Sequence, residues 1–165
     1  MAKKIDVAAL PVRTGTFYPP PYSEPCLARA RRTLGDAAGL TQFGVNLLTL
    51  PAGAWSSQRH WHLKQDEFVY ILEGEVVLVT NAGEEILRAG DCAGFKAGDE
   101  DGHHLQNRSG ANALLLEVGT RVTGDGAEYP GIDLVHPANG LPALYTHQDG
   151  TPYPDIKWRG VDTKD

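Results

Sequence analysis

Short apolar segments punctuated by glycine are the feature that most constrains the fold of this 165-residue chain. Between residues 42 and 120, such segments recur about every ten residues, whereas a helical pattern is confined to residues 25–34. This spacing is typical of antiparallel sandwiches and barrels, and not of alternating β–α units. We therefore predict an all-β fold. The predicted strands are residues 43–50, 55–62, 67–72, 75–80, 84–87, 92–96, 103–107 and 113–118.

The composition divides the chain into three parts. We predict an N-terminal arm at residues 1–41, a β-barrel at 42–120, and a C-terminal arm at 121–165 that packs on the barrel or on a partner subunit. Residues 68–72 and 76–79 are apolar on both faces of their strands. One face can line the barrel interior, but the other must also be covered. We expect the arms and a second subunit to cover it, which makes the protein a homodimer.

Charge and hydropathy exclude several classes of protein. A net charge of −6 argues against a nucleic-acid partner. The wholly apolar runs are far shorter than the ~20 residues that a membrane helix needs. The two lysines near the N-terminus are followed by no signal-like apolar stretch, so we expect a cytoplasmic protein whose partner is a small molecule. Two cysteines cannot form a disulfide framework, and we expect Cys92 to lie in the core.

Turn signals fix some strand registers and leave others open. Asn81-Ala82-Gly83 between two apolar runs predicts a β-hairpin. The first barrel strand can be phased in two ways, because its side chains alternate between the two faces of the sheet. Either Phe43, Val45 and Leu47 or Asn46, Leu48 and Leu50 face the cavity.

Four of the six histidines fall in two tight groups, His60-Trp61-His62 and His103-His104. On a strand, residues two apart point the same way, so His60 and His62 present both imidazoles to one face. Glu67 lies an odd number of residues further on, but a turn at residues 64–66 can reorient the chain. We therefore expect Glu67 to face inward with the two histidines, at one mouth of the barrel.

The residues around the first group resemble a known pattern. Gly53, His60, His62, Glu67 and Gly74 are spaced as in the first motif of the cupin superfamily, except that six residues rather than five separate Gly53 from His60. The resemblance extends over residues 43–118, just under half of the chain. It implies a double-stranded β-helix, or jelly roll, here with extended N- and C-terminal arms.

A second motif of the same family is recognisable around the other histidine group. It comprises Gly90, Gly98, a histidine and Asn107, with Lys96 where the family usually has proline. Four residues rather than two separate Gly98 from the histidine, which leaves both His103 and His104 as alternatives. Asn107 favours His103, because the family's histidine is followed four residues later by asparagine. Strand alternation also places His103 and Asn107 on the inward face.

The resemblance implies a metal centre. In cupins, two histidines and a glutamate of the first motif and one histidine of the second bind a divalent ion, and these are here His60, His62, Glu67 and His103. Such a mixed nitrogen and oxygen set fits Zn, Fe, Ni or Mn and leaves one or two positions open. The bound ion would retain a net charge of about +1, which suits an anionic or sugar-like oxygen ligand.

The resemblance leaves the activity open. We expect a metal-dependent enzyme that acts on a small oxygen-rich metabolite as an isomerase, a lyase or decarboxylase, or a dioxygenase. Glu67 is the expected catalytic residue, either as a ligand throughout or as a base after partial release. The alternative is a non-catalytic sensor or binding protein. Residues 146–154 are similar to those of small single-domain bacterial cupins of unassigned activity, which are often labelled by analogy as sugar-phosphate isomerases or regulators.

Overall fold

The computed structural model describes residues 4–160, and nearly all of its regular elements are strands, which pair in antiparallel fashion. This confirms the all-β prediction. No helix in the described range is long and apolar enough to cross a bilayer. In chain order the elements are β1 (Arg13–Thr14), the 3-10 helix η1 (Glu24–Cys26), β2 (Ala30–Thr33), α1 (Leu34–Ala37), β3 (Phe43–Leu50), β4 (Trp61–His62), β5 (Glu67–Glu73), β6 (Glu75–Thr80), β7 (Gly83–Arg88), β8 (Cys92–Phe95), β9 (His104–Gln106), β10 (Ala113–Thr120), β11 (Ala127–Glu128), β12 (Val135–His136) and the 3-10 helix η2 (Ala138–Gly140).

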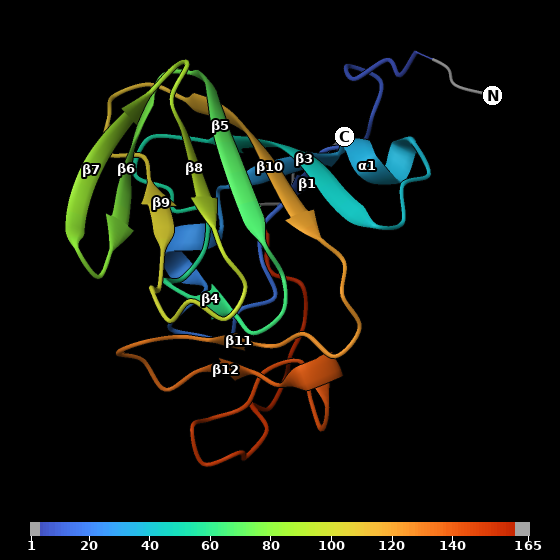
Figure 1. Ribbon diagram of the computed structural model, residues 1–165, viewed down its shortest axis with the longest axis vertical. Coiled ribbons are helices and arrows are strands. Elements are labelled where there is room, and N and C mark those ends of the chain that lie inside the picture. The colour runs from blue at the N-terminus through green and yellow to red at the C-terminus, as the bar shows by residue number, and fades with distance from the viewer. Residues whose placement is uncertain (1–3, 161–165) are drawn as a thin grey trace.

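Two sheets form the barrel (Figure 1). The larger has the strand order β1-β2-β3-β10-β5-β8, and the smaller has the order β7-β6-β9. The core lies between them, with Leu48, Ile71 and Leu115 from the large sheet packed against Val76 and Leu105 from the small one. Burial of these side chains is the main term that stabilises the barrel.

Strand alternation settles the open register. Leu48 and Leu50 are fully buried and Asn46 lines the interior cavity, so the second phase of β3 is the one observed. Along β5 the inward positions Val69 and Ile71 are buried, while the alternating side chains Phe68, Tyr70 and Leu72 are exposed on the other face. The hairpin expected at residues 81–83 is also present, since Thr80 pairs with Gly83 and joins β6 to β7.

The predicted strand at 55–62 is mostly irregular, and only Trp61–His62 forms a ladder. The cause lies in the backbone carbonyls of residues 56–58, which accept hydrogen bonds from side chains rather than from a neighbouring strand. Ser56 O accepts from Arg29, and Ser57 O accepts from His104 Nδ1 at 3.1 Å. His60 then rejoins the sheet through an isolated bridge to His103.

The helical pattern at residues 25–34 does not produce a single helix. Glu24–Cys26 forms the 3-10 helix η1, whereas Ala30–Thr33 pairs with β3 and extends the large sheet. Cys92 is exposed rather than in the core, since it lies opposite Tyr70 on the outer face of the same sheet. In both places tertiary pairing, which local composition does not encode, decides the outcome.

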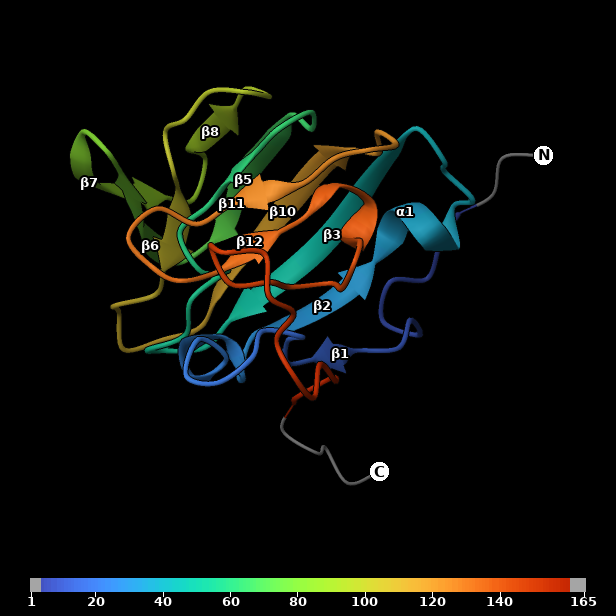
Figure 2. The same ribbon diagram turned by 90° about the horizontal axis from the view of Figure 1, so that it is seen from below.

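The C-terminal segment crosses the mouth of the barrel. The short strand β11 pairs with β4 on one side and with β12 on the other, and Figure 2 shows these strands in front of the large sheet. A second apolar cluster joins this segment to the N-terminal one, with Tyr18 and Cys26 packed against Tyr129 and Leu134. One end of the barrel is therefore walled by residues remote in sequence.

Candidate metal centre

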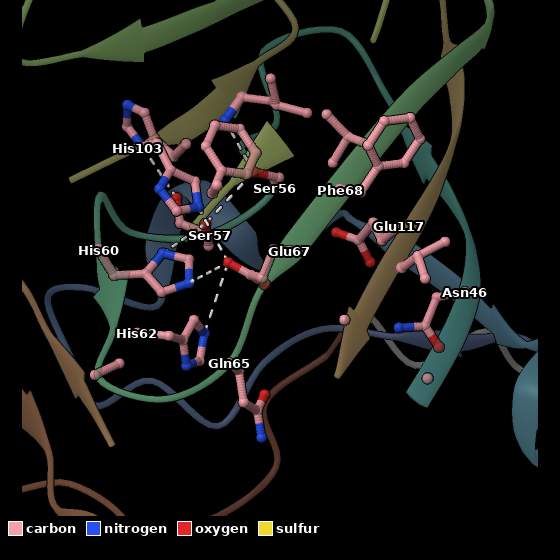
Figure 3. A pocket seen from close by; sticks show the side chains of 18 of the residues that line it. Asn46, Ser56, Ser57, His60, His62, Gln65, Glu67, Phe68, His103 and Glu117 are labelled. Carbon is pink, nitrogen blue, oxygen red and sulfur yellow. Dashed lines mark hydrogen bonds and ion pairs between the residues drawn. The ribbon is translucent and has the colours of Figure 1, made fainter. Parts of the chain in front are cut away.

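Three imidazoles converge on one carboxylate oxygen inside the barrel mouth (Figure 3). The Nε2 atoms of His60, His62 and His103 lie 3.6, 3.7 and 3.0 Å from Oε2 of Glu67. His60, His62 and Glu67 each offer a donor atom within 4.8 Å of the other two, and His103 joins them through its approach to Glu67. The structure thus brings together the four side chains that the cupin resemblance implied.

The turn between β4 and β5 brings Glu67 to the histidine face. Residues 63–66 leave the ladder, and Lys64 N donates to Asp125 Oδ1 at 2.8 Å while Asp66 N donates to Thr120 Oγ1 at 3.0 Å. These bonds anchor both ends of the turn to the chain around it. Strand β5 then begins at Glu67 with its odd-numbered side chains inward.

His103 and His104 point in opposite directions, as successive residues of a strand do. The His103 ring stacks on Phe95 with a centroid separation of 3.5 Å and approaches Glu67. His104 instead packs edge-on against Trp55 and lies with its Nε2 2.9 Å from the Gln106 amide nitrogen. Of the two alternatives, the structure therefore brings His103 to the centre.

Each of the three converging imidazoles is oriented by an oxygen behind it. His62 Nδ1 donates to Asp125 Oδ2 at 2.7 Å, and His60 Nδ1 donates to the Gln58 carbonyl at 3.0 Å. His103 Nδ1 lies 3.3 Å from the Asp101 carbonyl. Partners of this kind fix the tautomer of a metal-binding histidine and direct its Nε2 lone pair toward the ion.

The protonation states suit metal ligation. Burial lowers the pKa of His60 to about 4, so its ring is neutral near pH 7. Burial raises the pKa of Glu67, but the bond with His103 and the neighbouring histidines outweigh this effect and lower it to about 2. Metals bind neutral imidazole and ionised carboxylate, the forms that burial favours at His60 and that the neighbouring histidines favour at Glu67.

A divalent ion would satisfy the polar atoms of this arrangement. The oxygens behind His60 and His62 can only accept, so the Nδ1 atoms of both rings donate and their Nε2 lone pairs face Glu67 Oε2, itself an acceptor. The Nε2 of His103 lies within hydrogen-bond distance of the same oxygen, at 3.0 Å. Burial disfavours an imidazolium at His60, whereas a divalent cation bound beside Glu67 would satisfy these lone pairs. Three nitrogens and one carboxylate are a donor set for a first-row divalent metal.

A cavity of about 410 Å³ opens beside the centre, a size suited to a small metabolite. Arginine and polar side chains line it together with the histidines. The other lining side chains include Arg29, Arg31, Asn46, Gln65, Glu117 and Arg121.

Sequence spacing missed several residues of this site. Asp125 bonds His62, and Tyr129 stacks on His60. Both residues lie in the segment after the barrel, more than about 60 residues away from the histidines along the chain. Arg31 on β2 and Glu117 on β10 bond each other across the intervening strand β3 of the large sheet. No short-range pattern links any of these residues to the histidines, and only the closed barrel brings them together.

Asp125 provides a direct test of the ring orientation. Replacing Asp125 with asparagine is expected to weaken divalent-metal affinity about 10–100-fold, because His62 loses its charged partner. Titration with Zn²⁺ against a chromogenic chelator measures this loss. Asp133→Asn is the matched control, since Asp133 bonds His147 at the same 2.7 Å but outside the cavity. Equal affinities of the two variants would contradict the orienting role.

A family model and solved structures that match this chain both point to the cupin family. Residues 46–119 match the cupin domain family. A sugar phosphate isomerase of a cupin superfamily from Silicibacter pomeroyi is 43% identical over 94% of this chain and 100% of its own, with a TM-score of 0.85. A protein from Acidithiobacillus ferrooxidans, provisionally named a sugar phosphate isomerase, is 25% identical over 77% of this chain and 81% of its own, with a TM-score of 0.69. The polyketide cyclase RemF of Streptomyces resistomycificus shares the fold at 18% identity over 73% of this chain and 80% of its own, with a TM-score of 0.59. A search of curated proteins found no match.

Proposed function

The chain belongs to the cupin superfamily, with a double-stranded β-helix barrel, and from this membership we propose that it is a metal-dependent enzyme. The proposed ligands of its divalent ion are His60, His62, Glu67 and His103. The proposed substrate is a small, oxygen-rich metabolite that is anionic or sugar-like. The ion itself is proposed to be Zn, Fe, Ni or Mn, which all accept this donor set.

One observation carries the proposal above the others. The three Nε2 atoms approach a single oxygen of Glu67 within 3.7 Å, and each ring is held from behind by an oxygen acceptor. A purely structural cluster would pair its polar atoms with one another, as donor with acceptor. Here the Nε2 lone pairs of His60 and His62 face the acceptor Oε2 of Glu67 beside the cavity, which supports a metal-binding role.

Among the three reaction types, isomerisation has the most support. The 43% identical protein from Silicibacter pomeroyi is named a sugar phosphate isomerase and covers nearly the whole chain. Arg29 lines the cavity and forms no salt bridge within residues 4–160, so its positive charge favours an anionic substrate. We therefore propose an aldose–ketose interconversion of a sugar phosphate as the first activity to test.

The residues of the site would have different roles in such a reaction. A divalent metal in this centre would supply Lewis-acid polarisation of a substrate oxygen. The three histidines hold the ion, and Asp125 keeps the His62 ring aligned. Glu67 serves as a ligand or, after partial release, accepts the substrate proton on Oε2. Phe95 and Tyr129 stack on two of the rings and restrict water around them.

Turnover distinguishes an enzyme from a sensor. We would incubate metal-loaded protein with ribose 5-phosphate, arabinose 5-phosphate or glucose 6-phosphate in D₂O and follow by NMR the deuterium at C1 of the ketose product and at C2 of the recovered aldose. An enzyme gives exchange and product, and His62→Ala abolishes both while circular dichroism shows the fold retained. Tight binding of one of these compounds without exchange would favour the alternative, a non-catalytic sensor.

We further propose that the outer face of the large sheet joins two copies of the chain. Phe68, Tyr70 and Leu72 expose 41%, 38% and 37% of their surface there, which makes an apolar row on β5. Sedimentation at micromolar concentration should show a dimer for the wild type and a monomer for Tyr70→Asp. Ile86→Asp, on the small sheet, should remain dimeric. A monomeric wild type would contradict the proposal.

A further inference from the structure

A row of polar side chains runs from the metal centre across the inner face of the large sheet. Glu117 on β10 lies opposite Asn46 on β3, and Gly119 on β10 lies opposite Glu67 on β5. Glu117 is therefore the diagonal neighbour of Glu67, about 7–8 Å away between backbones. Figure 3 shows Glu117 between Glu67 and Asn46. A molecule held at the centre meets this row next.

Arg31 binds Glu117 through two parallel hydrogen bonds. Its Nε donates to Oε2 at 2.7 Å, and its Nη2 donates to Oε1 at 2.9 Å. Nη2 also donates to the Ser56 carbonyl at 3.3 Å. Within residues 4–160, no hydrogen bond is made by Nη1, and the carboxylate keeps one free lone-pair direction on each oxygen. The pair thus presents donors and acceptors side by side.

Asn46 adds a second group of the same kind. Its side-chain amide, with two donors and an acceptor, lines the cavity and has no hydrogen-bond partner in the described part of the chain. A carboxamide beside an arginine–carboxylate pair offers alternating donors and acceptors. Adjacent hydroxyl groups, each a donor and an acceptor, complement that pattern.

The charge of the row points to hydroxyls rather than to a phosphate. Arg31 and Glu117 neutralise each other, and Asn46 is uncharged, so the row offers no surplus positive charge. Arg29 is buried behind it, where it donates to Gly15 O, Ser56 O and Thr16 Oγ1. A phosphate would need a free arginine or lysine at this position.

We propose that Arg31, Asn46 and Glu117 bind the vicinal diol of a polyhydroxylated substrate and so determine its specificity. This inference rests on the proposed function, because the other end of the substrate is held at the metal centre. The row makes the site selective for a carbon chain with two adjacent hydroxyls next to the metal-binding group. Compounds that carry only the metal-binding group lack these contacts.

Two hydroxy acids isolate the contribution of the row. D-erythronate and 2-hydroxybutyrate share a carboxylate and an α-hydroxyl that chelate a metal, but only erythronate adds hydroxyls at C3 and C4. Calorimetric titration of Ni²⁺-loaded wild type should show erythronate binding at least about tenfold more tightly, the effect of one or two added hydrogen bonds to charged groups. Asn46→Ala and Glu117→Gln should abolish this preference and leave 2-hydroxybutyrate affinity and nickel content unchanged.

Gln65→Ala is the matched control, since Gln65 lines the same cavity from the β4–β5 turn, outside the row. It should retain the tenfold preference. Equal affinities for the two acids in wild-type protein, including no measurable binding of either, would overturn the diol row and leave the metal centre standing. A wild type that takes up no nickel would overturn the proposed function and the row with it. Because Glu117 supports Arg31, Asn46→Ala provides the test if Glu117→Gln fails to fold.

Discussion

Glu67→Gln is expected to lower divalent-metal affinity by at least about a hundredfold while leaving the barrel folded. The three histidine Nε2 atoms converge on Oε2 of this side chain, so the substitution removes the one negative charge at their meeting point. Removing a residue that hydrogen-bonds a metal ligand typically weakens metal affinity about 10–100-fold. Removing the charge of a direct ligand should weaken it by more than that. Competition with a chelator of known affinity measures the change.

The control for this substitution lies on the same strand. Glu73 is exposed at the other end of β5, and Glu73→Gln should leave metal affinity within about twofold of the wild type. Circular dichroism of both variants checks that the barrel is intact. Tight metal binding by a folded Glu67→Gln variant would show that the carboxylate is not a metal ligand. Of the two proposed roles of Glu67, only that of a base would then remain.

Ile71→Ala is expected to lower the free energy of unfolding by about 2–5 kcal/mol, the usual cost of emptying a well-packed core position. Ile71 has no exposed surface and sits among side chains from both sheets of the barrel. Urea denaturation in the presence of a chelator measures the difference without a contribution from bound metal. All samples need the same protein concentration, because a dimer gains stability with concentration.

Ile86→Ala is the matched substitution on the surface. Ile86 exposes 46% of its area on β7, so the same truncation there should cost less than about 0.5 kcal/mol. A similar loss in both variants would contradict the assignment of the core to the space between the two sheets. The comparison also tests the register of β5, since a shift of one residue would move Ile71 to the outer face.

Much of the barrel could be predicted from the sequence because the signals of antiparallel strands, which are turn residues and alternating apolar side chains, lie within a few neighbouring residues. The 81–83 turn and the alternation along β5 follow from neighbouring residues, and the structure reproduces both. Local signals fail where side chains satisfy the backbone. Residues 56 and 57 leave the sheet because Arg29 and His104 bind their carbonyls, and neither residue is a neighbour in sequence.

The candidate site shows the same division. The spacing of His60, His62 and Glu67 places all three on one face once the 64–66 turn is allowed for, and the structure brings them together. Asp125 and Glu117 could not be found in this way. They reach the site through the closure of the barrel and the return of the C-terminal segment, and these long-range pairings have no periodic signature in the sequence.

Metal content tests the central claim most directly. The protein would be purified without a histidine tag, as wild type and His62→Ala, and analysed for elements before and after incubation with Zn, Fe, Ni and Mn salts followed by desalting. We expect close to one divalent ion per wild-type chain and almost none in a folded His62→Ala variant. A wild type that stays empty after every metal has been offered, or a variant that retains a full ion, would contradict the metal centre described for this barrel.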